Sequence, residues 1–187
     1  ARWLHGWGVP VQTWSLTEAS TGDAGVMRAA CARAGVAAVS TLGDPGLVVD
    51  ACFGTGLSRE ISGEFAAAIA AINAAPVVVS VDIPSGLCAD TGRVLGAAVK
   101  ADTTVTFGYL KQGFYGEPAA DFLGLVDVVD IGLGVTTSPI EIGVTEAQDI
   151  ADQWPKRSGS DHKGKSGHLL VVAGSTQMAG AAVLTCS

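Results

Sequence analysis

Residues 77–92 read VVVSVDIPSGLCADTG and change from a continuous apolar run to polar and turn-forming residues. An apolar run without strict alternation is typical of a parallel strand that is covered on both faces. The run ends around Asp82, and Pro84, Ser85 and Gly86 follow it. A proline turn accounts for these residues locally, while a carboxylate and a hydroxyl at a strand end also suit a binding site. The stretch therefore predicts a buried strand that ends in either a turn or the rim of a site.

Strands and helices alternate on both sides of this stretch. Apolar runs predict further strands at 9–16, 36–40, 47–51, 103–110 and 124–132, and Ala-rich or periodic segments predict helices at 22–34 and 62–73. Ser62 is placed to cap the second helix, in which Phe65, Ile69 and Ile72 recur at helical spacing. Strands that alternate with helices through short connections predict an α/β fold with a Rossmann-like, doubly wound and mostly parallel sheet.

The composition argues against several classes of function. The 187 residues carry a net charge of −7 and no basic cluster able to neutralise a run of phosphates, which disfavours nucleic-acid binding. No apolar run reaches the roughly 20 residues that span a bilayer, and the first residues do not resemble a secretory signal. The four cysteines are scattered without a CxxC pair. We therefore expect buried free thiols in a reducing cytoplasm rather than a zinc site or a redox dithiol.

The chain divides into three parts by composition. Residues 1–134 hold the alternating pattern, 135–166 are polar with prolines and basic residues, and 167–187 begin a strand, a Gly-Ser turn and a helix. We expect an α/β domain, an interdomain linker and the start of a second α/β domain. The basic HKGKSGH at 162–168 fits a flexible linker better than a phosphate or metal site. The first segment, ARWLHGWG, reads as the end of a helix, and the last, GAAVLTCS, stops within a helical pattern. We interpret the chain as a fragment of a longer protein.

Small, polar and charged residues follow three of the predicted strands. Asp50 precedes FGTG, Asp82 precedes PSG, and Lys111 comes soon after the strand that begins at residue 103. In doubly wound sheets, ligands bind beyond the carboxyl ends of the strands. The sequence therefore predicts a site at this edge of the sheet.

Each of these features also has a plain structural interpretation. Gly54 and Gly56 would let the backbone approach a phosphate or a sugar, but without GxGxxG or a P-loop lysine they also suit a simple turn beside Asp50. A nucleophilic Ser85 is disfavoured, because there is no GxSxG and no histidine nearby. Oxygen ligands at this edge would suit an alkali or alkaline-earth cation. A lone lysine such as Lys111 is usually solvated, and ADTG at 89–92 fits a structural turn.

Four motifs in this order resemble those of the NAD(P)H-hydrate epimerase family, over about residues 1–134. They are VVDACFGTGLSREISGEF, VVVSVDIPSGLCADTG, VLGAAVKADTTVTFGYLKQGFY and GLVDVVDIGLG. The later HKGKSGHLLVVAGSTQMAGAAVLT resembles the start of the ADP-dependent NAD(P)H-hydrate dehydratases, which have a ribokinase-like fold. An epimerase followed by a dehydratase is the order in the bifunctional bacterial NAD(P)H-hydrate repair proteins.

The resemblance implies an isomerase that interconverts the R and S forms, at C6, of hydrated NADH and NADPH. It implies that a longer parent protein also dehydrates the S form with ADP. Potassium would be held by Asp50 and Ser85, and the substrate would contact Asp82. The remaining substrate contacts implied are Gly54, Thr55, Gly56, Leu57, Ser58, Arg59 and Glu60. From the chemistry, we expect Asp82 to handle a proton or stabilise charge, with Lys111 as the second candidate.

Two other functions stay open on the sequence. An NAD(P)-dependent oxidoreductase is disfavoured, because GxGxxG with a downstream acidic residue is absent. A nucleotide-binding module without catalysis would need the same polar groups. The family's NNGGDG-type phosphate motif would precede residue 1 and is not part of these 187 residues. The expected partner is a small-molecule substrate, and the sequence leaves open whether the chain forms a homo-oligomer.

Overall fold

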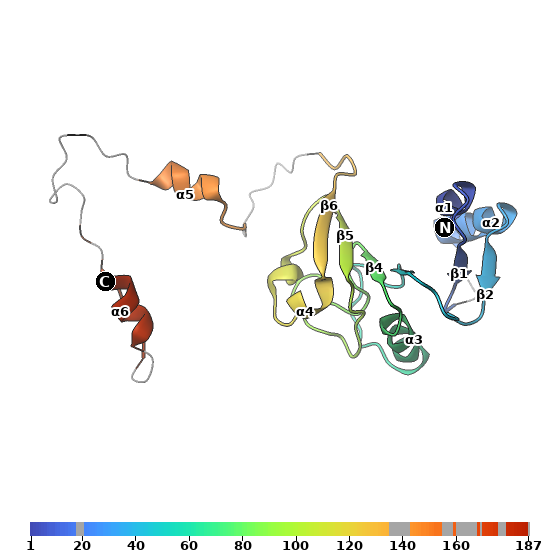
Figure 1. Ribbon diagram of the computed structural model, residues 1–187, viewed down its shortest axis with the longest axis horizontal. Helices are drawn as coiled ribbons and strands as arrows, with labels where there is room; N and C mark the ends of the chain where they lie inside the picture. Colours follow the sequence, from blue (N-terminus) through green and yellow to red (C-terminus); the bar gives the residue numbers. More distant parts are fainter. Residues whose placement is uncertain are drawn as a thin grey trace. The chain divides into compact units, whose positions relative to one another are not determined.

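A computed structural model describes residues 1–17, 21–134, 143–154, 159, 168, 170–175 and 179–186. The chain divides into two compact units, residues 1–139 and 140–187, which are described separately. Figure 1 shows the helices and strands of both units along the chain. The first unit contains the sheet and all of the residues expected to form the site.

The first unit is an α/β structure in which every strand pair is parallel. Its strands form a two-stranded sheet, β1-β2, and a four-stranded sheet in the order β3-β4-β5-β6 (Figure 1). The strands are β1 (Gln12–Trp14), β2 (Ala37–Val39), β3 (Val48–Asp50), β4 (Val78–Val81), β5 (Thr103–Phe107) and β6 (Leu125–Val129). The helices are α1 (Arg2–Gly6), α2 (Gly22–Arg33), α3 (Gly63–Asn73), the 3₁₀ helix η1 (Gln112–Tyr115) and α4 (Ala120–Leu123). Parallel strands with intervening helices confirm the predicted fold class.

Each observed strand lies within its predicted range and is shorter than that range. A strand ends where pairing with its neighbour ends, and this can precede the end of an apolar run. Helix α3 begins after Ser62 as predicted, although the Ser62 side chain makes no capping hydrogen bond. Its residues Ile69 and Ile72 are each 2% exposed and pack in one cluster with Val48 and Val78. This cluster fixes α3 against β3 and β4.

A second apolar cluster supports the turn that follows β4. It consists of Ile83, Leu87, Ala98, Phe114, Ala119 and Leu123. Within this turn Gly86 has a φ of 103°, and a Cβ atom there would collide with the carbonyl oxygen of Ala97. Only glycine fits both the backbone conformation and the close approach. The turn after β4 is therefore packed closely against residues 97–98.

The prediction that the four cysteines are buried is wrong. Cys52 and Cys186 are exposed, and Cys31 and Cys88 are partly buried, although all four are free thiols. Small apolar neighbours in the sequence do not determine whether a side chain is covered, because the cover comes from other segments.

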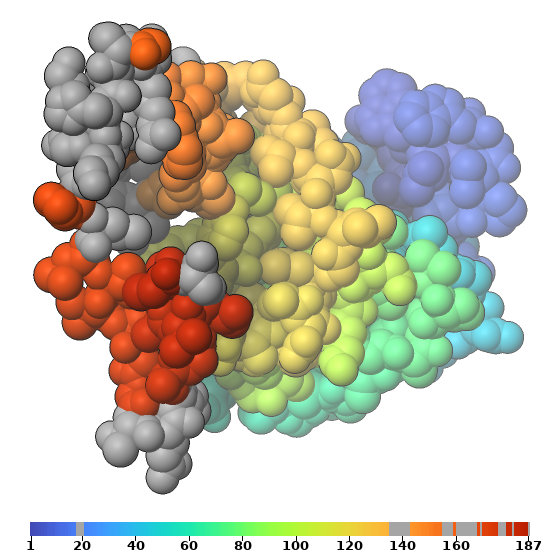
Figure 2. Space-filling model, turned by 60° about the vertical axis from the view of Figure 1, so that its left-hand side comes forward, coloured from blue at the N-terminus to red at the C-terminus, as the bar shows by residue number. Residues whose placement is uncertain are grey.

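Strand β6 is exposed at every position despite its apolar sequence. Its yellow atoms lie at the surface in Figure 2.

The second unit contains helices α5 (Ala147–Gln153) and α6 (Gly180–Cys186). Helix α5 lies in the predicted linker and begins with a capping box formed by Glu146 and Asp149. Helix α6 occurs where a helix was predicted. The strand predicted after residue 167 is not present in the described residues 168 and 170–175. A parallel strand forms only beside a hydrogen-bonding neighbour, and these residues are paired with no other strand.

Among the described residues, no helix has the length and apolar character needed to cross a bilayer.

Candidate functional site

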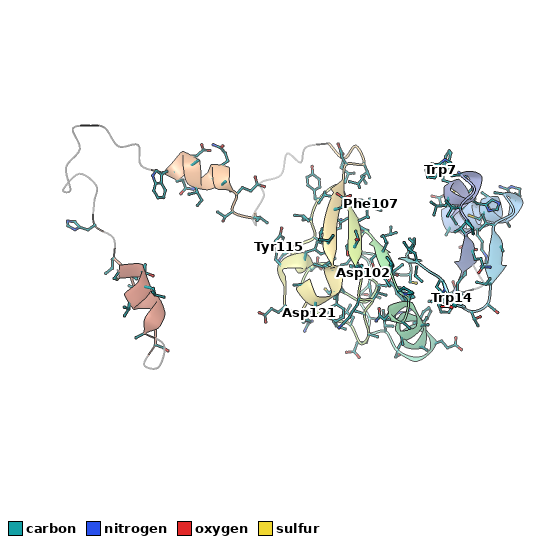
Figure 3. The ribbon with its side chains drawn as sticks, viewed as in Figure 1. Trp7, Trp14, Asp102, Phe107, Tyr115 and Asp121 are labelled. Atoms are coloured by element: carbon teal, nitrogen blue, oxygen red, sulfur yellow. The ribbon has the colours of Figure 1, made fainter. Side chains whose placement is uncertain are left out.

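The carboxyl ends of three adjacent strands meet at one edge of the four-stranded sheet. Asp50 is the last residue of β3 and is in register with Ser80 of β4. Asp82 follows β4, and its backbone N–H donates to Val105 of β5 over 2.7 Å. Figure 3 labels Phe107 at the carboxyl end of β5 and Asp102 just before the start of that strand. The parallel register therefore brings the candidate residues to the predicted edge.

Asp50 is a buried carboxylate that joins β3, β4 and two turns. It is 1% exposed. Its Oδ1 accepts from the Ser85 hydroxyl over 2.6 Å and from the Cys52 N–H over 3.2 Å. Its Oδ2 accepts from the Ser85 N–H over 2.8 Å and from the Ser80 hydroxyl over 2.9 Å. A carboxylate has about four lone-pair positions, so the protein itself supplies a donor for each.

Ser85 connects this carboxylate to the loop that follows β3. It is fully buried, and its Oγ accepts from the Phe53 N–H over 2.8 Å. The same Oγ lies 3.3 Å from the Phe53 carbonyl oxygen. Because the hydroxyl has one hydrogen and Asp50 is much nearer, that hydrogen goes to Asp50. The Phe53 carbonyl and one lone pair of Ser85 Oγ are then the oxygen sites left over in this network.

The loop after β3 forms a pocket. Its volume is about 320 Å³, at the lower end of the range for small-molecule sites. Its lining residues are Cys52, Phe53, Gly54, Gly56, Leu57, Ser58 and Arg59. Five of the eight residues predicted for substrate binding therefore line it, and Thr55, Glu60 and Asp82 do not.

Asp82 and Lys111 form an ion pair at the same edge. Lys111 Nζ lies 2.8 Å from Asp82 Oδ1, and the two side chains are 17% and 23% exposed. Asp82 Oδ1 also accepts from the Phe107 N–H over 3.1 Å and from the Thr106 hydroxyl over 3.2 Å. Burial by itself would raise the pKa of Asp82, but the Lys111 ammonium and the Phe107 N–H outweigh burial and lower this pKa. The carboxyl group is therefore ionised at neutral pH.

The backbone at Asp82 is also unusual. Among the described residues other than glycine, Asp82 alone has a positive φ, of 69°. Asp is one of the few residue types that enter this region without a large penalty. The conformation turns the chain sharply at the end of β4, three residues before the buried Ser85.

A family described as YjeF-related protein N-terminus matches residues 1–113 of the sequence. That is more than half of the chain. The chain belongs to this family.

Curated proteins that resemble this chain carry names that describe an activity. A protein of Moorella thermoacetica named bifunctional NAD(P)H-hydrate repair enzyme is 43% identical over 145 residues, which are 75% of this chain and 27% of that protein. A protein of Oenococcus oeni named NAD(P)H-hydrate epimerase is 41% identical over 139 residues, covering 71% of this chain and 66% of that protein. The chain thus spans less than a third of the bifunctional relative and about two thirds of the epimerase.

The ADTG turn at residues 89–92, predicted to be structural, is held by backbone hydrogen bonds. The ADTG turn is closed by a 2.8 Å hydrogen bond from the Gly92 N–H to the Cys88 carbonyl, beside a bridge between Leu87 and Val94. Its side-chain contact comes from the Thr91 hydroxyl, which accepts from the Arg93 N–H over 3.4 Å. The HKGKSGH segment lies outside the described residues except for His168. Over the described residues, no cluster of three His, Cys, Asp or Glu side chains suits a metal ion.

The site residues not predicted from the sequence include Ser80, Thr106 and Phe53. They contact Asp50, Asp82 and Ser85 respectively. Ser80 and Thr106 are fully buried polar residues within apolar strands. A buried polar side chain needs a hydrogen-bonding partner, so a hydroxyl two residues from Asp82 in VVVSVD, and another in TTVTF, were the available signals.

Proposed function

We propose that this chain is the epimerase part of an NAD(P)H-hydrate repair enzyme and interconverts the R and S forms of hydrated NADH and NADPH at C6. One observation supports this most directly. A glycine-containing pocket and a partly exposed, ionised carboxylate, Asp82, occur at one sheet edge in a chain of this family. The names of the relatives supply the substrate class.

The proposed chemistry requires stabilisation of a positive charge. The C6 hydroxyl is next to the ring nitrogen, whose lone pair expels it while the oxygen takes a proton from solvent and leaves as water. The resulting ring cation accepts water on either face, and the added water returns one proton to solvent. Asp82 stabilises the cation, because a fixed carboxylate acts where the charge develops. The low pKa of Asp82 favours this role over that of a proton donor.

The pocket loop supports binding of the nucleotide part. A Cβ atom on Gly54 or Gly56 would meet no heavy atom within 4 Å, and neither residue has a positive φ. Neither packing nor backbone conformation therefore requires glycine there. Close approach of a ligand to the backbone is a physical reason that remains, and Arg59 adds a positive charge at the pocket for a phosphate.

The oxygen atoms near Ser85 fit a potassium ion in their chemistry. Hard cations prefer carboxylate, hydroxyl and carbonyl oxygens, and Asp50, Ser85 and Phe53 supply one of each. The Asp50 carboxylate is already occupied by four protein donors. We therefore propose Ser85 Oγ and the Phe53 carbonyl as the direct ligands from this chain, with Asp50 holding Ser85 in place. When bound, the ion would supply positive charge beside the pocket.

A second activity belongs to the proposal only for a longer protein. The name of the Moorella relative describes two repair functions in one polypeptide. We propose the second, ADP-dependent dehydration of the S form, only for a longer protein that contains this segment. A cytoplasmic location fits the same proposal.

The deciding experiment starts from a pure epimer. The protein at its full natural length is incubated with the R form, and the S form is followed by chromatography in potassium and in sodium buffers. We expect the S form to appear faster than without enzyme, and faster in potassium. Binding of the R form without conversion would instead support a nucleotide-binding module. No conversion and no binding would overturn the proposal altogether.

A further inference from the structure

The ion pair and the hydrogen bonds of the Asp82 carboxylate with described residues all fall on one of its two oxygens. Oδ1 accepts from Lys111, Thr106 and the Phe107 N–H at 2.8 to 3.2 Å. Within the described part of the chain, no donor lies at hydrogen-bonding distance from Oδ2. Because all three contacts fall on Oδ1, they fix the direction of the carboxylate and leave Oδ2 without a protein partner among the described residues. The free oxygen is the one available to a ligand.

The Lys111 ammonium is held as firmly as the carboxylate. Its Nζ lies 3.0 Å from each of three further acceptors: Thr106 Oγ1 and the carbonyl oxygens of Phe107 and Tyr109. With Asp82 there are four acceptors for three hydrogens. Thr106 donates to Asp82 and accepts from Lys111, so the three side chains form a closed triangle. The sequence-based alternative of a solvated Lys111 is therefore wrong.

We propose that Lys111 and Thr106 are positioning residues that fix Asp82 Oδ1 and present Oδ2 to the substrate. This inference rests on the proposed epimerase function for the identity of that substrate. Lys111 serves as neither the acid nor a phosphate ligand in this arrangement, because its hydrogens are all used within the protein. The ion pair acts as a fixed dipole whose negative end, Oδ2, faces the position of the ring cation.

The backbone supports this assignment independently of the side chains. An isolated ion pair at a surface contributes little to stability, typically less than about 1 kcal/mol. Asp82 nevertheless occupies a left-handed conformation at the sheet edge, and such outliers concentrate where a side chain must be aimed. The triangle also spans β4, β5 and the start of η1, so three elements fix one carboxylate oxygen.

The test compares four variants of the protein at its full natural length. Lys111→Met removes the ammonium at similar length, Lys111→Arg retains the charge, and Thr106→Val removes the hydroxyl. Lys100→Met is the matched control, because Lys100 is exposed and its amine lies over the Phe122 ring rather than near Asp82. Two measurements are made. The pKa of the Asp82 carboxyl group is followed by NMR titration of its carboxyl carbon, and kcat and KM are measured for the R epimer.

We expect Lys111→Met to raise the Asp82 pKa, because burial is then no longer opposed by the ammonium. Its kcat should fall by about 100-fold with little change in KM, as when a preorganised electrostatic contact is lost, and the acid limb of its pH profile should move upward. Thr106→Val should show a smaller fall, Lys111→Arg should recover part of the rate, and Lys100→Met should match the unmodified protein.

Two results would overturn the inference. One is an unchanged Asp82 pKa in Lys111→Met; the other is a loss of thermal stability without any change in kcat or pH profile. The NMR titration needs no activity, so it decides the contact even if the unmodified protein fails to interconvert the epimers. That failure would overturn the proposed function instead.

Discussion

Ser85 donates its hydroxyl hydrogen to Asp50 over 2.6 Å, and both side chains are at most 1% exposed. The pair joins the end of β3 to the turn after β4, and Phe53 extends it to the pocket loop. The geometry of the pocket therefore depends on this buried network. The same network would determine where a cation can bind.

Asp50→Asn should destabilise the protein strongly. The NH₂ group of the asparagine would face N–H or O–H groups of Ser80 or Ser85 that donate to Asp50. Buried donors would then lack acceptors, at a cost of about 2–4 kcal/mol. Urea unfolding followed by circular dichroism measures this change. Asp127→Asn on exposed β6 is the control and should change the free energy of unfolding by less than about 0.5 kcal/mol. Equal effects of the two substitutions would show that the network is not stabilising.

Asp82 should make stability depend on pH at the acid end. Its pKa is lower in the folded protein than in the unfolded chain, so it contributes stability above its unfolded pKa. That contribution is lost as the pH falls through the folded value. Because the carboxylate is partly exposed, the effect should be no more than about 1 kcal/mol. The free energy of unfolding between pH 2.5 and 7, compared with that of Asp82→Asn, should show a shallower slope in the variant.

Two glycine substitutions should separate binding from folding. Gly54→Ala should change the free energy of unfolding by less than about 1 kcal/mol, because its Cβ meets open space. The same change should weaken binding of the hydrated nucleotide. Gly86→Ala should destabilise the protein by more than about 2 kcal/mol, because its Cβ would collide with Ala97 and its φ is positive. Calorimetric binding and urea unfolding are measured on both, and unimpaired binding by Gly54→Ala would contradict a ligand role for this loop.

Cys52 and Cys88 should differ in reactivity. Desolvation, followed by the negative charge of Asp50, raises the pKa of Cys52 to about 12, even though the residue as a whole is exposed. Hydrogen bonding to Thr91 lowers the pKa of Cys88. Since the thiolate is the reactive form, iodoacetamide at pH 8 should modify Cys88 first. Peptide mass spectrometry measures the two rates, and they should become similar in urea; faster modification of Cys52 in the folded protein would contradict this.

Local patterns predicted the strands and helices well in the first unit. The apolar runs located all six strands, and helical spacing placed Ile69 and Ile72 in the core. The patterns overestimated strand length and the burial of the cysteines. They also predicted a strand after residue 167 that is not formed in the described residues there. In each case the missing information is a contact from elsewhere in the chain.

The sequence by itself determined the parallel α/β fold, the family and the edge of the sheet where polar residues gather. Periodicity and motif order are local properties, so they can be found without coordinates. Only the tertiary structure showed that Asp50 is saturated by four donors and that Lys111 and Thr106 bind a single oxygen of Asp82. These contacts join residues far apart in the chain, and strand register and the turn at Asp82 determine which of them meet.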